Sequence, residues 1–110
     1  MKGTNLGELE ELVMLTVAIL YDNAYGVAIQ KEVAERARRS LTISTVHSVL
    51  SRLEEKGYLH SRYDGATPAR GGRRKHLFTL TIAGQKVLED AKMMRNKMWD
   101  AIPKIALQNE

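Results

Sequence analysis

The clearest pattern of apolar and polar positions in the chain lies at residues 42–57. Apolar side chains recur there at intervals of three and four residues, and they are Val46, Val49, Leu50 and Leu53. This spacing gathers them on one face of a helix, which should pack against the core. The opposite face carries small hydroxyl side chains, and Gly57 follows as a residue type that commonly ends helices. We therefore expect an amphipathic helix whose outward face can form hydrogen bonds.

Two stretches with a strand-like period follow this helix. Residues 58–63 and 73–80 alternate, and the loop between them is rich in Gly and Arg. The pattern predicts an antiparallel hairpin. In its second strand, Phe78 and Leu80 should face the helices and Leu77 should face the other side. A helix followed by a basic hairpin is the arrangement of a winged helix.

Two further helices are expected before this unit. Residues 6–21 are apolar on nearly every side in their second half, which is typical of a helix covered by two layers, and Asn5 with Glu8 resembles a capping box at its start. A second helix should face the core with Ile29, Val33 and Ala37. Residues 40–43 are expected to form a brief third strand. Residues 1–80 are thus predicted to be a winged helix-turn-helix domain, mainly α with a small antiparallel β-hairpin.

The C-terminal part, residues 81–110, is predicted to be a long helix that mediates dimerisation. Thr81 is a suitable N-cap, and Gly84 in the first turn would allow a close approach to the sheet. Apolar residues then follow at spacings of 4, 3, 4, 3 and 4, which is a heptad-like seam, and they are Val87, Ala91, Met94, Met98, Ala101 and Ile105. Pro103 should make this helix kink or restart.

Charge is distributed unevenly along the chain. The formal net charge is +4, but residues 1–35 carry −4, residues 36–76 carry +7 and residues 77–110 carry +1. The excess of Lys and Arg therefore coincides with the predicted helix and hairpin. A polyanion such as double-stranded DNA accounts for that placement, whereas an ordinary solvated surface would not require it.

Several other classes of function are disfavoured by the sequence. The chain has no Cys, which excludes disulfides and a thiolate metal site. Its longest apolar run, residues 12–20, is too short for a membrane span, so we expect a cytoplasmic protein without a membrane partner. No catalytic set or phosphate-binding loop is evident, and no cofactor is expected. His60 and His76 could approach each other across the hairpin, but further metal ligands are missing.

Candidate DNA contacts lie on the outward face of the helix and on the hairpin, and they are Ser44, Thr45, His47, Ser48, Ser51, Arg52, Arg70, Arg73, Arg74 and Lys75. Either Thr42 or Ser44 caps the helix, and a hydroxyl that caps is not free to read a base. Arg52 can bind guanine or hold a phosphate, with the phosphate favoured. His47 can contact DNA or simply lie at the surface. Strand alternation implies that Arg73, Arg74 and Lys75 cannot all contact one groove.

Five short motifs together resemble the PadR family of bacterial transcriptional regulators over residues 6–88. They are Leu6-Gly7-x-Leu9-Glu10, Tyr25-Gly26, Leu50-x-Arg52-Leu53-Glu54-x-x-Gly57, Gly71-Gly72-Arg73-Arg74-Lys75 and Leu80-Thr81-x-x-Gly84. The resemblance implies a homodimeric repressor with a C-terminal dimerisation helix. In proteins similar to this one, the dimer can leave an apolar opening for flat hydrophobic or aromatic effectors.

Met94, Met98 and Trp99 are the candidate ligand residues for such an effector, because Met offers adaptable walls and Trp a stacking plane. The competing interpretation is that Trp99 packs on the first helix of a partner subunit. The rival function is a winged helix that binds proteins rather than specific DNA. A basic hairpin favours DNA, since a protein-binding module need not concentrate positive charge there.

Overall fold

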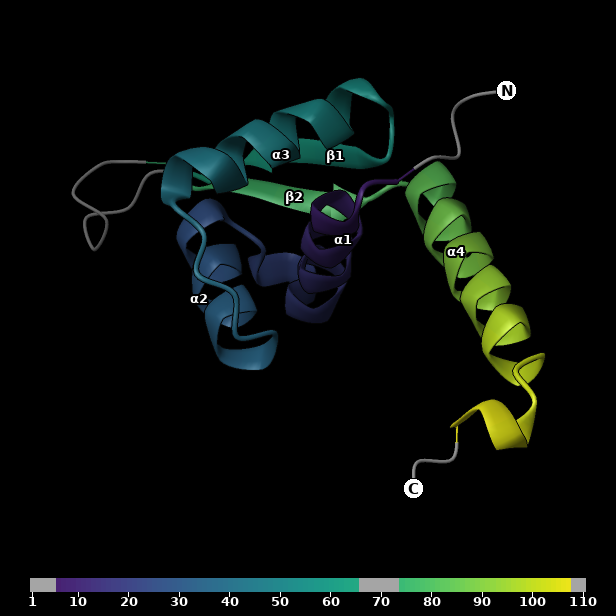
Figure 1. Cartoon of the computed structure of the whole chain (residues 1–110). Coiled ribbons are helices and arrows are strands. Elements are labelled where there is room, and N and C mark those ends of the chain that lie inside the picture. Colours follow the sequence, from purple (N-terminus) through teal and green to yellow (C-terminus); the bar gives the residue numbers. More distant parts are fainter. Residues whose placement is uncertain (1–5, 66–73, 108–110) are drawn as a thin grey trace.

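The computed structural model describes residues 6–65 and 74–107. Within these residues the elements follow the order α1 (Glu8–Leu20), η1 (Tyr21–Asn23), α2 (Gly26–Arg36), α3 (Ile43–Glu55), β1 (Leu59–Tyr63), β2 (His76–Leu80), α4 (Ile82–Asp100) and η3 (Lys104–Leu107). The chain is thus mostly helical with a two-stranded antiparallel sheet, which confirms the predicted fold class. Figure 1 shows α1, α2, α3 and the hairpin gathered into one body, from which α4 projects.

The core lies where α1, α2 and α3 meet the hairpin. The apolar face of α3 predicted from the sequence is buried, and each of Val46, Val49, Leu50 and Leu53 is at most 2% exposed. Met14 on α1 and Ile29 on α2 are completely buried. Phe78 on β2 closes the core from the hairpin side. This packing fixes the face of α3 that is left for solvent, which is the face of its serines.

The start of α1 differs from the prediction. The N-cap is Gly7 rather than Asn5, which lies outside the described residues, and the backbone N–H of Gly7 donates to Glu10 Oε1 at 2.9 Å. Glu10 therefore takes the capping role that the sequence suggested for Glu8. The side chain of Glu8 instead points to solvent and pairs with Arg39 at 2.9 Å.

The hairpin pairs Leu59 with Leu80 at one end and Tyr63 with His76 at the other. In the described residues no strand forms at 40–43, so that expectation was wrong. The third position beside the hairpin is supplied by Tyr25, which makes an isolated bridge to Leu77. Leu77 is consequently buried, at 4% exposed, and does not face outward as predicted.

The base of α4 is tied tightly to the body. Thr81 caps the helix as predicted, because its Oγ1 accepts from the N–H of Gly84 at 3.0 Å, and the same hydroxyl donates to the carbonyl of Gly57 at 2.7 Å. A Cβ on Gly84 would collide with the backbone carbonyl oxygen of Tyr58, so the predicted close approach is confirmed.

The far end of α4 confirms the predicted effect of Pro103. The helix stops at Asp100, and η3 begins at Lys104 after a turn. Figure 1 shows η3 turning back from the direction of α4. The longest dimension of the molecule is 60 Å, against 35 and 20 Å for the other two. Within residues 6–65 and 74–107, no helix combines the length and apolar character needed to cross a bilayer.

Candidate nucleic-acid interface

The exposed face of α3 is a shallow hollow bordered by residues of four successive turns. It is lined by Ile43, Ser44, His47, Ser48, Ser51, Arg52 and Glu55. Five of these seven residues are among the candidate DNA contacts. We call this set the reading face. Its three serines are exposed, so their hydroxyls can meet the edges of bases or the phosphates of a duplex.

The sequence left open whether Thr42 or Ser44 is the N-cap of α3, and the structure identifies the residue. Thr42 is the cap, because its Oγ1 accepts from the backbone N–H of Thr45 at 3.1 Å. The Thr42 hydroxyl also donates to Oγ1 of Thr45 at 3.0 Å, so the Thr45 hydroxyl is engaged within the chain. Ser44 does not cap the helix, and its hydroxyl is therefore not committed to the helix end.

His47 marks the contact between α3 and the start of α2. A Cβ on Gly26 would lie 2.9 Å from His47 Cε1. A side chain at position 26 would therefore push the imidazole away. The ring of His47 nevertheless remains exposed on the reading face.

Arg52 has a buried partner that the sequence did not reveal. Its Nε donates to Glu10 Oε2 at 3.0 Å, and Lys56 Nζ donates to both carboxylate oxygens at 2.9 Å. Burial alone would raise the pKa of Glu10, but the hydrogen bonds from Gly7, Lys56 and Arg52 outweigh it and hold that pKa below its ordinary value. Glu10 is therefore charged at neutral pH.

A signal for Glu10 does exist in the sequence. The buried face of α1 contains Val13 and Val17, and Glu10 precedes Val13 by three residues, at a position where an apolar side chain would be expected. Arg52 and Lys56 are spaced by four residues, so they share one side of α3. An acid within an apolar stripe and a matching pair of cations indicate an interhelix ion pair, but which helices meet is set by the tertiary fold.

The basic residues of the hairpin diverge. The guanidinium of Arg74 lies 5.1 Å from the ring centroid of Tyr63, whereas Lys75 Nζ lies 4.4 Å from that of Tyr25. This agrees with the expectation that neighbouring strand residues point to different sides. His76 stacks on Tyr63 with 4.2 Å between ring centroids. Arg70 and Arg73 lie outside the described residues.

The predicted seam of α4 is not one helical stripe. Val87 is 6% exposed and packs in the core of its own chain, so it is not offered to a partner. Ala101 follows the end of α4, and Ile105 lies in η3, because the helix does not continue through Pro103. Met94 and Met98 remain as exposed apolar residues of the helix, at 51% and 66%.

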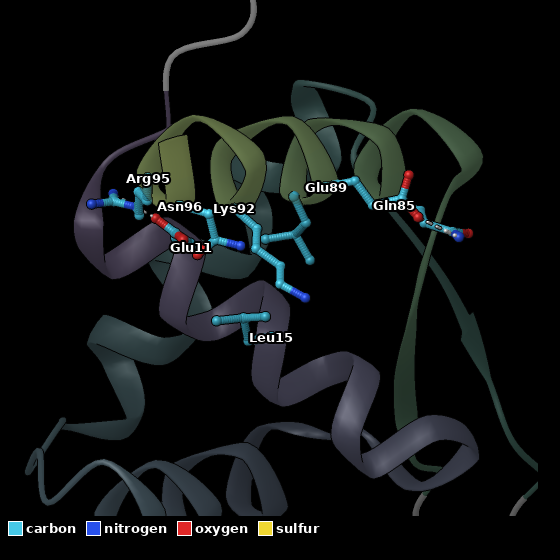
Figure 2. Close-up of a pocket in the computed structure, with 8 residues that line it drawn as sticks. Glu11, Leu15, Gln85, Glu89, Lys92, Arg95 and Asn96 are labelled. Carbon is cyan, nitrogen blue, oxygen red and sulfur yellow. Dashed lines mark hydrogen bonds and ion pairs between the residues drawn. The ribbon is translucent and has the colours of Figure 1, made fainter. Parts of the chain in front are cut away.

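Two hollows lie along the contact of α4 with α1. The first is a cavity of about 410 Å³. Figure 2 shows Leu15 of α1 and Lys92 of α4 between the two helices, with Arg95 at one end. Arg95 closes one end by an ion pair with Glu11 at 2.9 Å. Met94 lines the second hollow, whereas Met98 and Trp99 line neither and are exposed farther along α4.

The two histidines of the hairpin were considered as ligands of a metal ion. His60 pairs with Thr79 and His76 with Tyr63 in the hairpin register, so the two imidazoles are not directly opposite. No group of three or more His, Asp or Glu side chains in residues 6–65 and 74–107 is arranged to hold an ion.

Comparisons with known proteins give a consistent result. A model of the transcriptional regulator PadR-like family matches residues 14–90. A PadR family transcriptional regulator from Eggerthella lenta is 28% identical with a TM-score of 0.69, covering 93% of this chain and 88% of that one. A PadR family transcription regulator from a hypervirulent Clostridium difficile strain is 30% identical with a TM-score of 0.67, covering 86% and 93%. A search of the curated proteins finds no match.

Proposed function

The chain belongs to the PadR-like family of transcriptional regulators, and from this premise we propose that it is a homodimeric repressor whose DNA binding is relieved by a small hydrophobic ligand. DNA binding follows from the family, and such regulators are not enzymes. The observation that supports DNA binding by this chain is the reading face on α3, which is polar, exposed and adjacent to a basic hairpin. The helix supplies groups that read bases and the hairpin supplies charges that hold phosphates.

The role of the hairpin is tested by a matched pair of variants. Arg74 is exposed and Lys75 is half-buried beside Tyr25. Arg74→Ala should weaken binding to every duplex and reduce the slope of log K against log salt by about 0.9, the value for one lost phosphate contact. Lys75→Ala should have a smaller effect on both quantities. Fluorescence anisotropy with a random-sequence duplex at several salt concentrations gives both numbers.

If Arg74→Ala and the double variant Arg73→Ala/Arg74→Ala keep the affinity and salt slope of the parent protein, the hairpin does not contact DNA. Binding of a protein partner by this surface would then become the better interpretation. Ser48→Ala serves as the complementary variant, because it removes a hydroxyl from the reading face without changing charge. It should alter preference among sequences selected from a random library while leaving the salt slope unchanged.

Dimerisation is proposed for the second half of α4 together with η3. Met94, Met98 and Trp99 are all more than half exposed, which is unusual for large apolar side chains on one helix. On α1, Leu15 and Ile19 are 44% and 49% exposed. A second copy that covered these residues would bury an apolar surface on both helices. Residues 81–110 would then supply most of the subunit contact, and α1 of the DNA-binding domain would add to it.

An effector would act at this subunit contact. Trp99 and Met98 are 63% and 66% exposed, so an aromatic plane and a flexible thioether on this part of α4 are both accessible to a ligand. A ligand that favours one distance between the reading faces of the two subunits would change DNA affinity without contacting either reading face. The competing role of Trp99, packing on α1 of the partner, needs no ligand.

The effector proposal is tested with a panel of planar aromatic cations. Saturable quenching of Trp99 fluorescence should accompany weaker operator binding by the same compound, at concentrations that leave the bare duplex unaffected. Met98→Ala, if folded and dimeric, should lose both responses. A panel in which no compound changes fluorescence and DNA affinity together would argue against the pocket and favour simple packing of Trp99.

A further inference from the structure

Glu10 is a buried acid that the proposed function does not by itself require. It is 5% exposed, yet its carboxylate accepts hydrogen bonds from a backbone N–H and from two cationic side chains of α3. A buried charge persists only when such partners compensate for its lost hydration. An apolar residue at this position would pack in the core without needing any of them. The arrangement therefore ties the first turn of α1 to the last turns of α3.

Arg52 connects this buried acid to the reading face. Its Nε is bound to Glu10, but its side chain is 51% exposed and borders the same hollow as Ser48 and Ser51. A guanidinium has five N–H donors in a rigid plane, and the bond to Glu10 uses the one on Nε. The bond to Glu10 therefore fixes the orientation of the guanidinium and leaves its two terminal amino groups for another partner.

Resting on the proposed function, we infer that Glu10 is a positioning residue for DNA binding, which holds the guanidinium of Arg52 so that its terminal amino groups bind a DNA phosphate. Arg has many rotamers, and ordering a free Arg on binding costs conformational entropy. Fixing the guanidinium before DNA arrives removes part of that cost. Lys56 binds the same carboxylate, so the three side chains together keep a net charge of +1, which favours an anionic partner.

The opposite effect is predicted by simple electrostatics. An acid near the reading face repels DNA and also competes with phosphate for Arg52 and Lys56. On that view, replacing Glu10 by a neutral residue should strengthen binding. The two accounts therefore differ in the sign of one measurable change.

The experiment compares Glu10→Gln with Glu8→Gln. Both variants remove one negative charge from the first turn of α1, but Glu8 is exposed and pairs with Arg39 instead of α3. Glu10→Gln should bind a random-sequence duplex about tenfold more weakly and lower the salt slope by about 0.9, as expected for one charged contact. Glu8→Gln should bind as tightly as the parent protein or slightly more tightly.

The same measurements in an Arg52→Ala background separate positioning from general damage. Arg52→Ala alone should weaken binding about tenfold. Adding Glu10→Gln to it should cause little further loss, because the residue through which Glu10 acts is already gone. A merely structural role for Glu10 would instead produce the same further loss in both backgrounds, and this result would overturn the inference. Unchanged or tighter binding by a folded Glu10→Gln protein would overturn it equally.

Arg52→Lys carries the test if Glu10→Gln does not fold, as judged by circular dichroism. Lysine keeps the charge but has a single ammonium, which cannot hold Glu10 and a phosphate as a planar guanidinium does. Binding about as weak as that of Arg52→Ala supports the inference, and parent-like binding overturns it. If neither Arg52→Ala nor the hairpin variants affect DNA binding, the proposed reading surface itself is at fault rather than the role of Glu10.

Discussion

At the scale of single residues, two glycines hold the junctions of the fold for different reasons. Gly57 has a φ of 83°, in the left-handed region that a side chain disfavours, and it turns the chain from α3 into the hairpin. Gly84 has no such dihedral constraint and is needed for space, since α4 starts against the carbonyl of Tyr58. The second kind of glycine allows a sharp prediction.

Gly84→Ala should destabilise the protein by roughly 1–3 kcal/mol, because the added methyl group collides with backbone that cannot rotate away. The sign is informative, since Gly→Ala within a helix ordinarily stabilises by up to about 1 kcal/mol. Gly65→Ala is the control, because a Cβ at that position meets nothing within 4 Å. Urea denaturation of the two variants measures the difference, and a Gly84→Ala protein as stable as the parent would contradict the close contact of α4 with the backbone of Tyr58.

At the scale of elements, α3 divides its hydroxyl residues between folding and recognition. Thr42 satisfies the N-terminus of the helix, while Ser44, Ser48 and Ser51 face solvent on the reading face. The partition follows from position, because only the residue immediately before the helix can accept a bond from the first free N–H groups. Two neighbouring substitutions should therefore act on different properties.

Thr42→Ala should lower the free energy of unfolding by about 1 kcal/mol through loss of the cap. Ser44→Ala should change stability by less than about 0.5 kcal/mol, as expected for an exposed site. Its effect should instead appear as altered preference among DNA sequences selected from a random library. Thermal denaturation and sequence selection on both variants check this, and a Ser44→Ala protein that loses as much stability as Thr42→Ala would show that Ser44 has a structural role.

At the scale of the whole molecule, α4 is an arm that its own chain covers only at the base. Val87 is buried and Arg95 pairs with Glu11, but Met94 and Met98 on the second half of the helix remain exposed. A lone helix with such a surface gains little stability from its own backbone. For a dimer to bind successive major grooves of one duplex, its two reading faces would have to lie about 34 Å apart.

Met98→Lys should convert the protein to monomers, because it places a charge in the proposed apolar contact. Met93→Lys is the matched control. It makes the same change on the side of α4 that already carries Lys86 and Lys97, and should leave the dimer intact. Sedimentation at micromolar concentration distinguishes the two species. A monomeric parent protein, or equal behaviour of both variants, would argue against the proposed contact.

The order of the helices, the hairpin and most ends of the helices could be predicted from the sequence, because they depend on local periods and local chemistry. The start of α1 was the exception. The apolar face of α3, the stop at Gly57, the Thr81 cap and the interruption at Pro103 each rest on residues within a few positions of one another. Physical effects of this range are encoded in a short window of sequence. The concentration of Lys and Arg in residues 36–76 is likewise a property of the sequence alone.

Only the tertiary structure decided the contacts between distant segments. The partner of Arg52 lies 42 positions earlier in the chain, and the third neighbour of the hairpin proved to be Tyr25 rather than residues 40–43. Leu77 and Val87 are buried because other elements cover them. The spacing of apolar residues along a strand or a helix cannot predict which element will do so. The local sequence pattern determines which face of an element is apolar. Which other element packs on that face depends on the tertiary fold.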